Sequence, residues 1–266
     1  MTEIFYNGSF IATDSQALTP LSMAAMYGKG VFTTVAVYRS ELFLWEKHQD
    51  RLLKDAAAVG LDVSGIDAKL LNDAVHKTFE QNGLINGRVR ITLFDETPAA
   101  IWLNDGSAKT SVMINASEFR QMPESFVLGI SPYRINTASP LAGVKSCNYL
   151  ENVIAINEAK SKGWHEAVRL NDRGEVAGGC MSNIFWAKGD QLFTPHLSTG
   201  CLAGTTREFV LENSDCNEVA ATIDELENAD SIFLTSAGIG ITAVKVFKDK
   251  PLNTIYHEIL EMLPGI

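Results

Sequence analysis

A lysine between a loop and a predicted helix is the residue of this sequence best suited to covalent chemistry. Lys145 follows the small and apolar stretch 141–144 and precedes a helix predicted over residues 147–161. Apolar surroundings withdraw an ammonium from water and lower its pKa, and an uncharged amine can attack an aldehyde and later act as a general base. An ordinary solvated lysine beside a helix start would occupy the same position. The neighbouring residues must therefore show whether Lys145 is reactive.

Two further groups suit an anion. Arg51 lies in a helix predicted over residues 45–59, and a guanidinium can pair with a phosphate through two parallel hydrogen bonds. Thr205 and Thr206 follow Gly204 where another helix is predicted to begin, and the first N–H groups of a helix lack helical partners. An exposed helical arginine and an ordinary helix start would look the same, so neither group is decisive alone.

These residues belong to a series of short motifs. The motifs lie, in chain order, at residues 27–32, 48–52, 145–150, 166–176, 182–185, 192–195 and 204–207. Residues 145–150 match the pattern Lys-Ser-x-Asn-Tyr-Leu. In the order and spacing of the motifs the chain resembles the class IV aminotransferases, which are fold-type IV enzymes dependent on pyridoxal 5′-phosphate (PLP).

The resemblance implies an α+β fold in two domains, a small α/β N-terminal lobe and a larger β-rich C-terminal lobe. Residues 135–143 lack periodicity and contain turn formers, so we expect the boundary there. The predicted division is a small N-terminal α+β domain at 1–134, an interdomain loop at 135–143, and a cofactor-binding domain at 144–266. Relatives of this fold pair as homodimers, and we expect the same here.

The resemblance also implies roles for individual residues. Lys145 would be catalytic and would carry PLP as a Schiff base. The implied cofactor-binding residues are Arg51, Tyr149, Leu202, Thr205, Thr206, Ser236 and Ala237. Arg51 and the backbone N–H groups at 205–206 and 236–237 would bind the phosphate, Tyr149 would donate to the phenolic oxygen, and Leu202 would pack on the ring. Taken singly, Tyr149 and Leu202 are equally good core residues.

One position departs from the family pattern. Relatives carry a glutamate that pairs with the protonated pyridine nitrogen, and Gly178 occupies that position here. Glu175 lies three residues away along a predicted strand, and side chains alternate along a strand, so it would point to the opposite face. Loss of the carboxylate weakens the cofactor as an electron sink. Transamination should suffer more than β-elimination, in which the leaving group carries electrons away.

The choice of reaction rests on a few local features. Phe32-Thr33-Thr34 stands where many transaminases have Phe-Glu-Thr, and residues 141–145 and 183–189 are similar to 4-amino-4-deoxychorismate lyase, which releases pyruvate and forms p-aminobenzoate. The alternatives are a branched-chain or D-amino acid transaminase and a catalytically altered family member. A non-enzymatic binding protein is the rival from another class. The acidic stretch 92–98 replaces an Arg-Gly-rich loop of many relatives, so substrate specificity cannot be carried over.

The elements that must position these residues follow from periodicity. A hairpin is predicted over residues 4–11 around Asn7-Gly8, and helices over 67–82 and 205–213 as well as those above, with a terminal helix at the end of the chain. Strands are predicted at 31–38, 42–44, 88–94, 110–115, 126–131, 166–170, 175–178, 183–188, 191–194, 230–234 and 242–247.

Composition narrows the class of protein. The net charge of −10 argues against a general nucleic-acid surface, although local donors can still hold a small anion. The sequence shows neither a signal peptide nor a long apolar run, so we expect a cytoplasmic enzyme without a membrane span. The four cysteines are widely spaced and the five histidines isolated, which predicts free thiols and no metal site. The partner expected is a small-molecule amino substrate.

Overall fold

The computed structural model describes residues 3–15, 19–99, 109–252 and 258–263. The chain forms two compact units, one from residues 1–119 with 144–149 and one from residues 120–143 with 150–265. This grouping differs from the predicted division at 135–143. The segment that contains Lys145 belongs with the first unit, and residues 120–134 belong with the second because they include a strand of its sheet.

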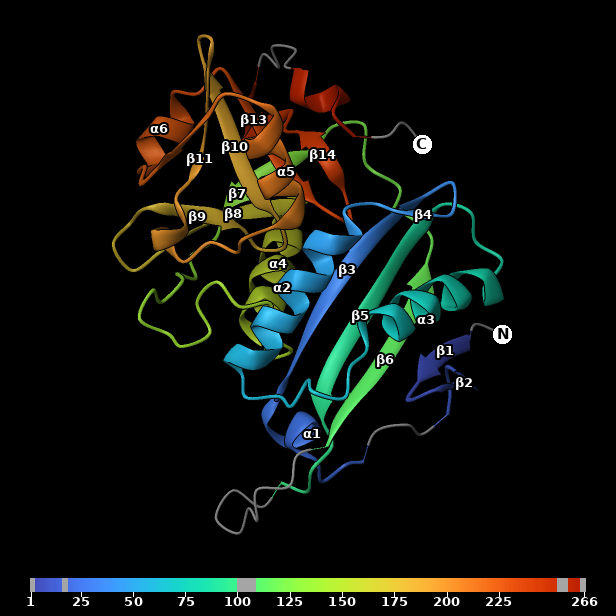
Figure 1. Ribbon diagram of the computed structural model, residues 1–266. Coiled ribbons are helices and arrows are strands. Elements are labelled where there is room, and N and C mark those ends of the chain that lie inside the picture. The colour runs from blue at the N-terminus through green and yellow to red at the C-terminus, as the bar shows by residue number, and fades with distance from the viewer. Residues whose placement is uncertain (1–2, 16–18, 100–108, 253–257, 264–266) are drawn as a thin grey trace. The chain divides into compact units, whose positions relative to one another are not determined.

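The first unit is a six-stranded antiparallel sheet with helices (Figure 1). The strand order is β2-β1-β6-β5-β3-β4. Its strands are β1 (Glu3–Tyr6), β2 (Ser9–Ala12), β3 (Gly30–Tyr38), β4 (Glu41–Leu42), β5 (Gly87–Asp95) and β6 (Thr110–Ser117). Its helices are α1 (Met23–Tyr27), α2 (Trp45–Ala58) and α3 (Ala68–Gln81). The predicted hairpin is confirmed, with Asn7 and Gly8 at φ 45° and 94°.

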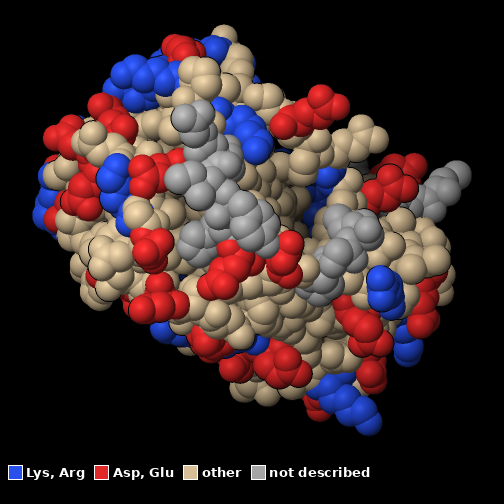
Figure 2. All heavy atoms as spheres, turned by 90° about the horizontal axis from the view of Figure 1, so that it is seen from above, with Lys and Arg blue, Asp and Glu red and all other residues tan. Residues whose placement is uncertain are grey.

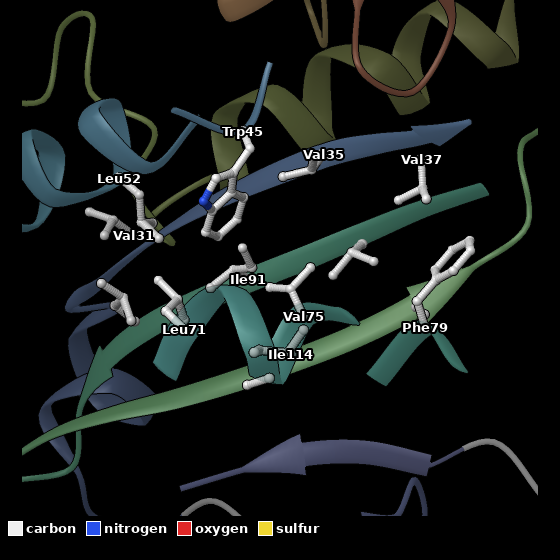
Figure 3. Close-up of a cluster of buried hydrophobic side chains, with 14 of the residues drawn as sticks. Val31, Val35, Val37, Trp45, Leu52, Leu71, Val75, Phe79, Ile91 and Ile114 are labelled. Carbon is white, nitrogen blue, oxygen red and sulfur yellow. The ribbon is translucent and has the colours of Figure 1, made fainter. Parts of the chain in front are cut away.

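Two helices cover one face of this sheet. In β3, Val31, Val35 and Val37 alternate toward that face and are fully buried, as the period of two in a strand requires. Leu52 of α2 and Phe79 of α3 pack into the same cluster (Figure 3). Burying these side chains holds α2 against β3, and α2 carries several of the charged residues of the site.

The second unit contains two five-stranded sheets, with orders β12-β11-β10-β13-β14 and β16-β15-β7-β8-β9. Its strands are β7 (Val127–Ile130), β8 (Glu166–Leu170), β9 (Val176–Gly179), β10 (Asn183–Lys188), β11 (Gln191–Pro195), β12 (Cys216–Val219), β13 (Ser231–Ser236), β14 (Gly240–Ala243), β15 (Val246–Phe247) and β16 (Lys250–Pro251). Its helices are α4 (Leu150–Ser161), α5 (Thr205–Asn213) and α6 (Ile223–Glu227), with 3₁₀ turns at Leu197–Thr199 and Glu258–Glu261.

Alternation along the strands gives the second unit its core. Val168 of β8, Ile184 of β10 and Leu234 of β13 are fully buried in one cluster that joins the two sheets. Phe185 and Phe233 point to the other side of their sheet and pack with Val210 of α5. The predicted α+β class is therefore confirmed.

Some predicted elements need correction. The predicted helix over 147–161 begins at Leu150, because the preceding residues are extended and pair with β3. The strand predicted over 242–247 is wrong as one element, since β14 and β15 lie in different sheets. The terminal helix is a 3₁₀ turn at Glu258–Glu261 in the part that is described, and residues 253–257 lie outside it.

Candidate active site

Lys145 lies on a short extended segment along the edge of β3. Ser146 forms an antiparallel bridge with Val31, and the Phe32 N–H donates to the Lys145 carbonyl at 3.0 Å. Side chains alternate along extended chain, so Ser146 points to the face of Val31 and Lys145 points to the face of Phe32. Backbone pairing with β3 thus fixes the direction of the lysine.

Two aromatic rings lie beside the lysine amine. The Lys145 Nζ is 4.5 Å from the centroid of the Phe32 ring and 5.1 Å from that of Tyr149. The two rings meet edge to face at 5.2 Å. The structure therefore places Tyr149, a predicted cofactor residue, next to Lys145 and the Phe32 ring.

A buried carboxylate contacts the backbone of the lysine. Asp55 of α2 is 5% exposed, and its Oδ2 accepts a hydrogen bond from the Lys145 N–H at 3.1 Å. Burial raises the pKa of Asp55, whereas this hydrogen bond and the charges of Arg51 and Lys145 act to lower it. Asp55 was not predicted from the sequence, because nothing local links a residue of α2 to a segment 90 positions away.

The surroundings favour an uncharged lysine. Burial, followed by the positive charges of Arg51 and Arg90, lowers the pKa of Lys145 from 10.5 to about 7. The Asp55 carboxylate acts in the opposite direction, because a negative charge stabilises the ammonium. A substantial fraction of Lys145 is therefore an uncharged amine at neutral pH, the form that attacks a carbonyl carbon and accepts protons.

Arg51 is held by a buried hydroxyl. Its Nη2 donates to the Thr33 Oγ1 at 2.8 Å, and the same oxygen lies 2.7 Å from the His48 Nδ1. Burial, with help from the charges of Arg51 and Lys145, lowers the pKa of His48 well below its usual value, so the imidazole is neutral. Thr33 can then accept from Arg51 and donate to the Nδ1, which places the imidazole proton on the Nε2.

Arg90 of β5 is a residue that the sequence analysis missed. Its guanidinium carbon lies 3.7 Å from the centroid of the Phe32 ring, and its charge acts on Lys145. Burial lowers the pKa of Arg90, and the nearby Cys147 and Tyr149 oppose this. The alternation of side chains along β5 could have indicated it. Apolar residues at 89, 91 and 93 fill the helix-covered face of the sheet, so position 90 lies on the opposite face.

The second unit carries the other predicted cofactor residues. Thr205 and Thr206 are the first two residues of α5, and Gly204 precedes them without a side-chain cap. The N-terminus of a helix of nine residues offers N–H donors and the positive end of its dipole to an anion. Ser236 ends β13 and Ala237 follows in the turn.

Asn183 connects the segment before α5 with the end of β13. It pairs with Thr235 across β10 and β13, and its Nδ2 donates to the Leu202 carbonyl at 2.8 Å. A side chain at position 204 would place its Cβ 1.9 Å from the Asn183 Oδ1, so the close approach requires Gly204. Asn183 belongs to the motif at residues 182–185, but no role was predicted for it from the sequence. The structure shows that it holds the loop before α5 against the end of β13.

Gly178 lies on β9, directly opposite Arg169 of β8. A Cβ at position 178 would meet only the Ser182 carbonyl oxygen, at 3.1 Å, and no other heavy atom within 4 Å. Glu175 is engaged elsewhere, since it accepts hydrogen bonds from Arg173 and Asn171. Space for a side chain at position 178 is therefore tight, and Glu175 is paired with other neighbours.

Each unit, taken by itself, carries groups of the kinds that PLP requires. The first unit offers an amine of lowered pKa, a guanidinium and a phenol, and the second offers a helix N-terminus for a phosphate. Thr235, next to Ser236, also has a buried hydroxyl without a hydrogen-bond partner, as a residue awaiting a polar ligand would. At Gly178 no side chain is present to pair with the pyridine nitrogen.

The described residues show no sign of a metal site or a membrane span. Among them, no group of three or more His, Cys, Asp or Glu is arranged to hold a metal ion, and no helix is long and apolar enough to cross a membrane. All four cysteines are free. On the face shown in Figure 2, acidic side chains are widely spread with basic ones between them.

Comparisons with known proteins identify the family. Residues 30–247 match the family described as amino-transferase class IV. The chain is 28% identical over 249 residues to aminodeoxychorismate lyase of Bacillus subtilis, covering 90% of this chain and 84% of the relative. It is 29% identical over 242 residues to D-alanine aminotransferase of Bacillus licheniformis, covering 88% and 84%.

Similar solved structures support the same family assignment. The branched-chain aminotransferase of Thermoproteus uzoniensis, solved with norvaline, superposes with a TM-score of 0.87 at 29% identity and covers 95% of this chain and 89% of that one. Structures of related folds contain pyridoxamine 5′-phosphate or a phosphopyridoxyl compound. The protein is thus a member of the class IV aminotransferase family of PLP-dependent enzymes.

Proposed function

We propose that the enzyme is a 4-amino-4-deoxychorismate lyase, which forms p-aminobenzoate and pyruvate. The observation that carries the choice of elimination over transamination is Gly178, where relatives have a carboxylate. Without it the pyridine nitrogen is less readily protonated, and a reaction that stores the full negative charge on the cofactor is disfavoured. An elimination passes the electrons to a leaving group. The similarity to the Bacillus subtilis lyase supports the same choice.

We propose that each unit supplies its own groups for PLP. In the first unit Lys145 would hold the aldehyde carbon, Arg51 the phosphate and Tyr149 the phenolic oxygen. In the second unit the backbone N–H groups of Thr205, Thr206, Ser236 and Ala237 would bind the phosphate, and Leu202 would pack on the ring. When bound, the cofactor withdraws electrons from the carbon that carries the substrate amine.

We propose that Lys145 has a second role as the general base, once the amine of the substrate has taken its place. Its uncharged amine would take the proton from the amino-bearing ring carbon of the substrate. The electron pair left behind would expel the enolpyruvyl oxygen from the adjacent carbon, the ring would become aromatic, and the enolpyruvate would take up a proton to give pyruvate. Arg90, which lies over Phe32 and acts on Lys145, would pair with a carboxylate of the substrate.

The test is pyruvate release from 4-amino-4-deoxychorismate without any keto-acid acceptor. We expect one pyruvate for each p-aminobenzoate formed. The same preparation, given branched-chain L-amino acids or D-alanine with 2-oxoglutarate, should be much slower. If product formation depends strictly on an acceptor, the enzyme is instead a transaminase. The similarity to D-alanine and branched-chain aminotransferases makes that the second candidate.

The bond from Arg51 to Thr33 gives a prediction on cofactor affinity. Thr33→Val removes the hydroxyl that binds the guanidinium but keeps the shape of the side chain. A hydrogen bond to a charged group contributes about 1.5–3 kcal/mol, so the dissociation constant for PLP should rise about tenfold or more. Thr110→Val is the matched control, since the Thr110 hydroxyl is buried in the same sheet without a hydrogen-bond partner. Equal affinities for the two variants in absorbance titrations would contradict the role given to Arg51.

We also propose that the enzyme is a homodimer with a small-molecule amino substrate. The support is the outward side of α4, where Leu150, Val153 and Ile154 are 64%, 40% and 44% exposed. The same helix buries Ala155 and Ala159 in the second unit, so it is apolar on both sides, as interface helices are. Sedimentation analysis of the purified protein gives its mass and tests this.

A further inference from the structure

The carboxylate of Asp55 stands out in the first unit because it serves no step assigned above. It is buried beneath α2, among cations contributed by different elements. Arg51 and Lys54 of α2 and Lys145 at the edge of β3 act on the carboxylate. Arg90 of β5 acts on Lys145, and the nearby His48 of α2 is neutral. Asp55 is the acid that opposes the effect of the two arginines on Lys145.

The backbone gives Asp55 a second function. The Lys145 carbonyl is bound by the Phe32 N–H, so β3 fixes one side of the peptide chain at the lysine. On the other side, the Lys145 N–H donates a hydrogen bond to the Asp55 Oδ2 at 3.1 Å. A buried N–H left without a partner would cost about 1–3 kcal/mol, so this bond holds the segment in place.

We propose that Asp55 is a positioning residue for Lys145, which fixes the lysine backbone through its N–H and places a buried negative charge beside its ammonium. The inference rests on the proposed role of Lys145 as the residue that holds PLP. The Asp55 charge raises the pKa of Lys145 against the effect of the two arginines, so that part of the amine stays protonated near neutral pH. The amine can then accept a proton during the reaction and release it afterward.

The test measures Lys145 directly, in the full-length chain freed of PLP. An amine-reactive anhydride is applied over a range of pH, and mass spectrometry quantifies the modified Lys145 peptide. In the wild type we expect the midpoint of modification near pH 7. In Asp55→Asn the acceptor oxygen remains and the charge is lost, so the ammonium is destabilised and the midpoint should fall by about one unit. Asp50→Asn, the same change at an exposed position of α2, should leave it unchanged.

The backbone function is tested separately, by hydrogen exchange of the Lys145 amide in the same cofactor-free chains. Exchange should be faster in Asp55→Ala, which has no acceptor, than in Asp55→Asn. An unchanged midpoint in Asp55→Asn would overturn the proposed charge effect, and equal exchange in the two variants would overturn the proposed bond. Neither measurement uses substrate or bound cofactor. Failure of the lyase assay would therefore leave this inference standing, and its own failure would leave the lyase proposal standing.

Discussion

Lys145→Ala is expected to abolish covalent binding of PLP and to lower turnover by about a thousandfold or more, since both the attachment point and the general base are lost. Pairing of residues 145 and 146 with β3 involves backbone atoms and should survive, so the variant should fold. The measurement is the visible absorbance of the protein after gel filtration, together with pyruvate release.

A control separates this result from a general loss of lysines. Lys160→Ala changes an exposed lysine on α4 and should keep both the absorbance band and the activity. An unchanged band in Lys145→Ala would mean that another group holds the cofactor, and the roles of Phe32 and Tyr149 beside the amine would have to be reassigned.

Gly178→Glu is expected to turn the enzyme toward transamination. The new carboxylate would stand where relatives pair an acid with the pyridine nitrogen, and it would favour the protonated ring. An opposite charge at close range shifts a pKa by about 1–3 units, so keto-acid formation from an amino donor and 2-oxoglutarate should rise at least about tenfold. A Cβ at position 178 would lie 3.1 Å from the Ser182 carbonyl oxygen, so a side chain there requires a small shift of the backbone at residue 182.

Gly178→Gln is the matched control, with nearly the same shape and no charge. It should leave the rate of transamination near that of the wild type. If the glutamine variant gains as much as the glutamate variant, filling the space and not the charge would be responsible. If neither gains, the missing carboxylate does not explain the choice of reaction.

The sequence was most informative where structure depends on neighbours along the chain. Gly204 followed by Thr205 and Thr206 predicts the start of α5, and α5 begins at Thr205. The hairpin at Asn7-Gly8 follows from a turn that needs positive φ angles. Short elements without a clear period were missed, among them α1 and the strand β12, whose sequence Cys-Asn-Glu-Val does not alternate.

The sequence was least informative where the site depends on pairing between distant segments. Asp55 and Arg90 come near Lys145 only because β3 pairs with β5 and because residue 146 lies against Val31. That register is set by the packing of whole strands and cannot be read from any short stretch of the sequence. The same pairing explains why the helix predicted from 147 starts at Leu150.

The position of Lys145 on the edge of β3 also bears on how the protein folds. Asp55 and Lys145 are 90 residues apart in the chain, so their contact closes a long loop and its entropy must be overcome before the bond forms. Contacts of such high sequence separation form slowly compared with hairpins and helices. We therefore expect the lysine to take its place late, after β3 and α2 have packed, and a chain that ends before residue 145 lacks the residue proposed to hold the cofactor covalently.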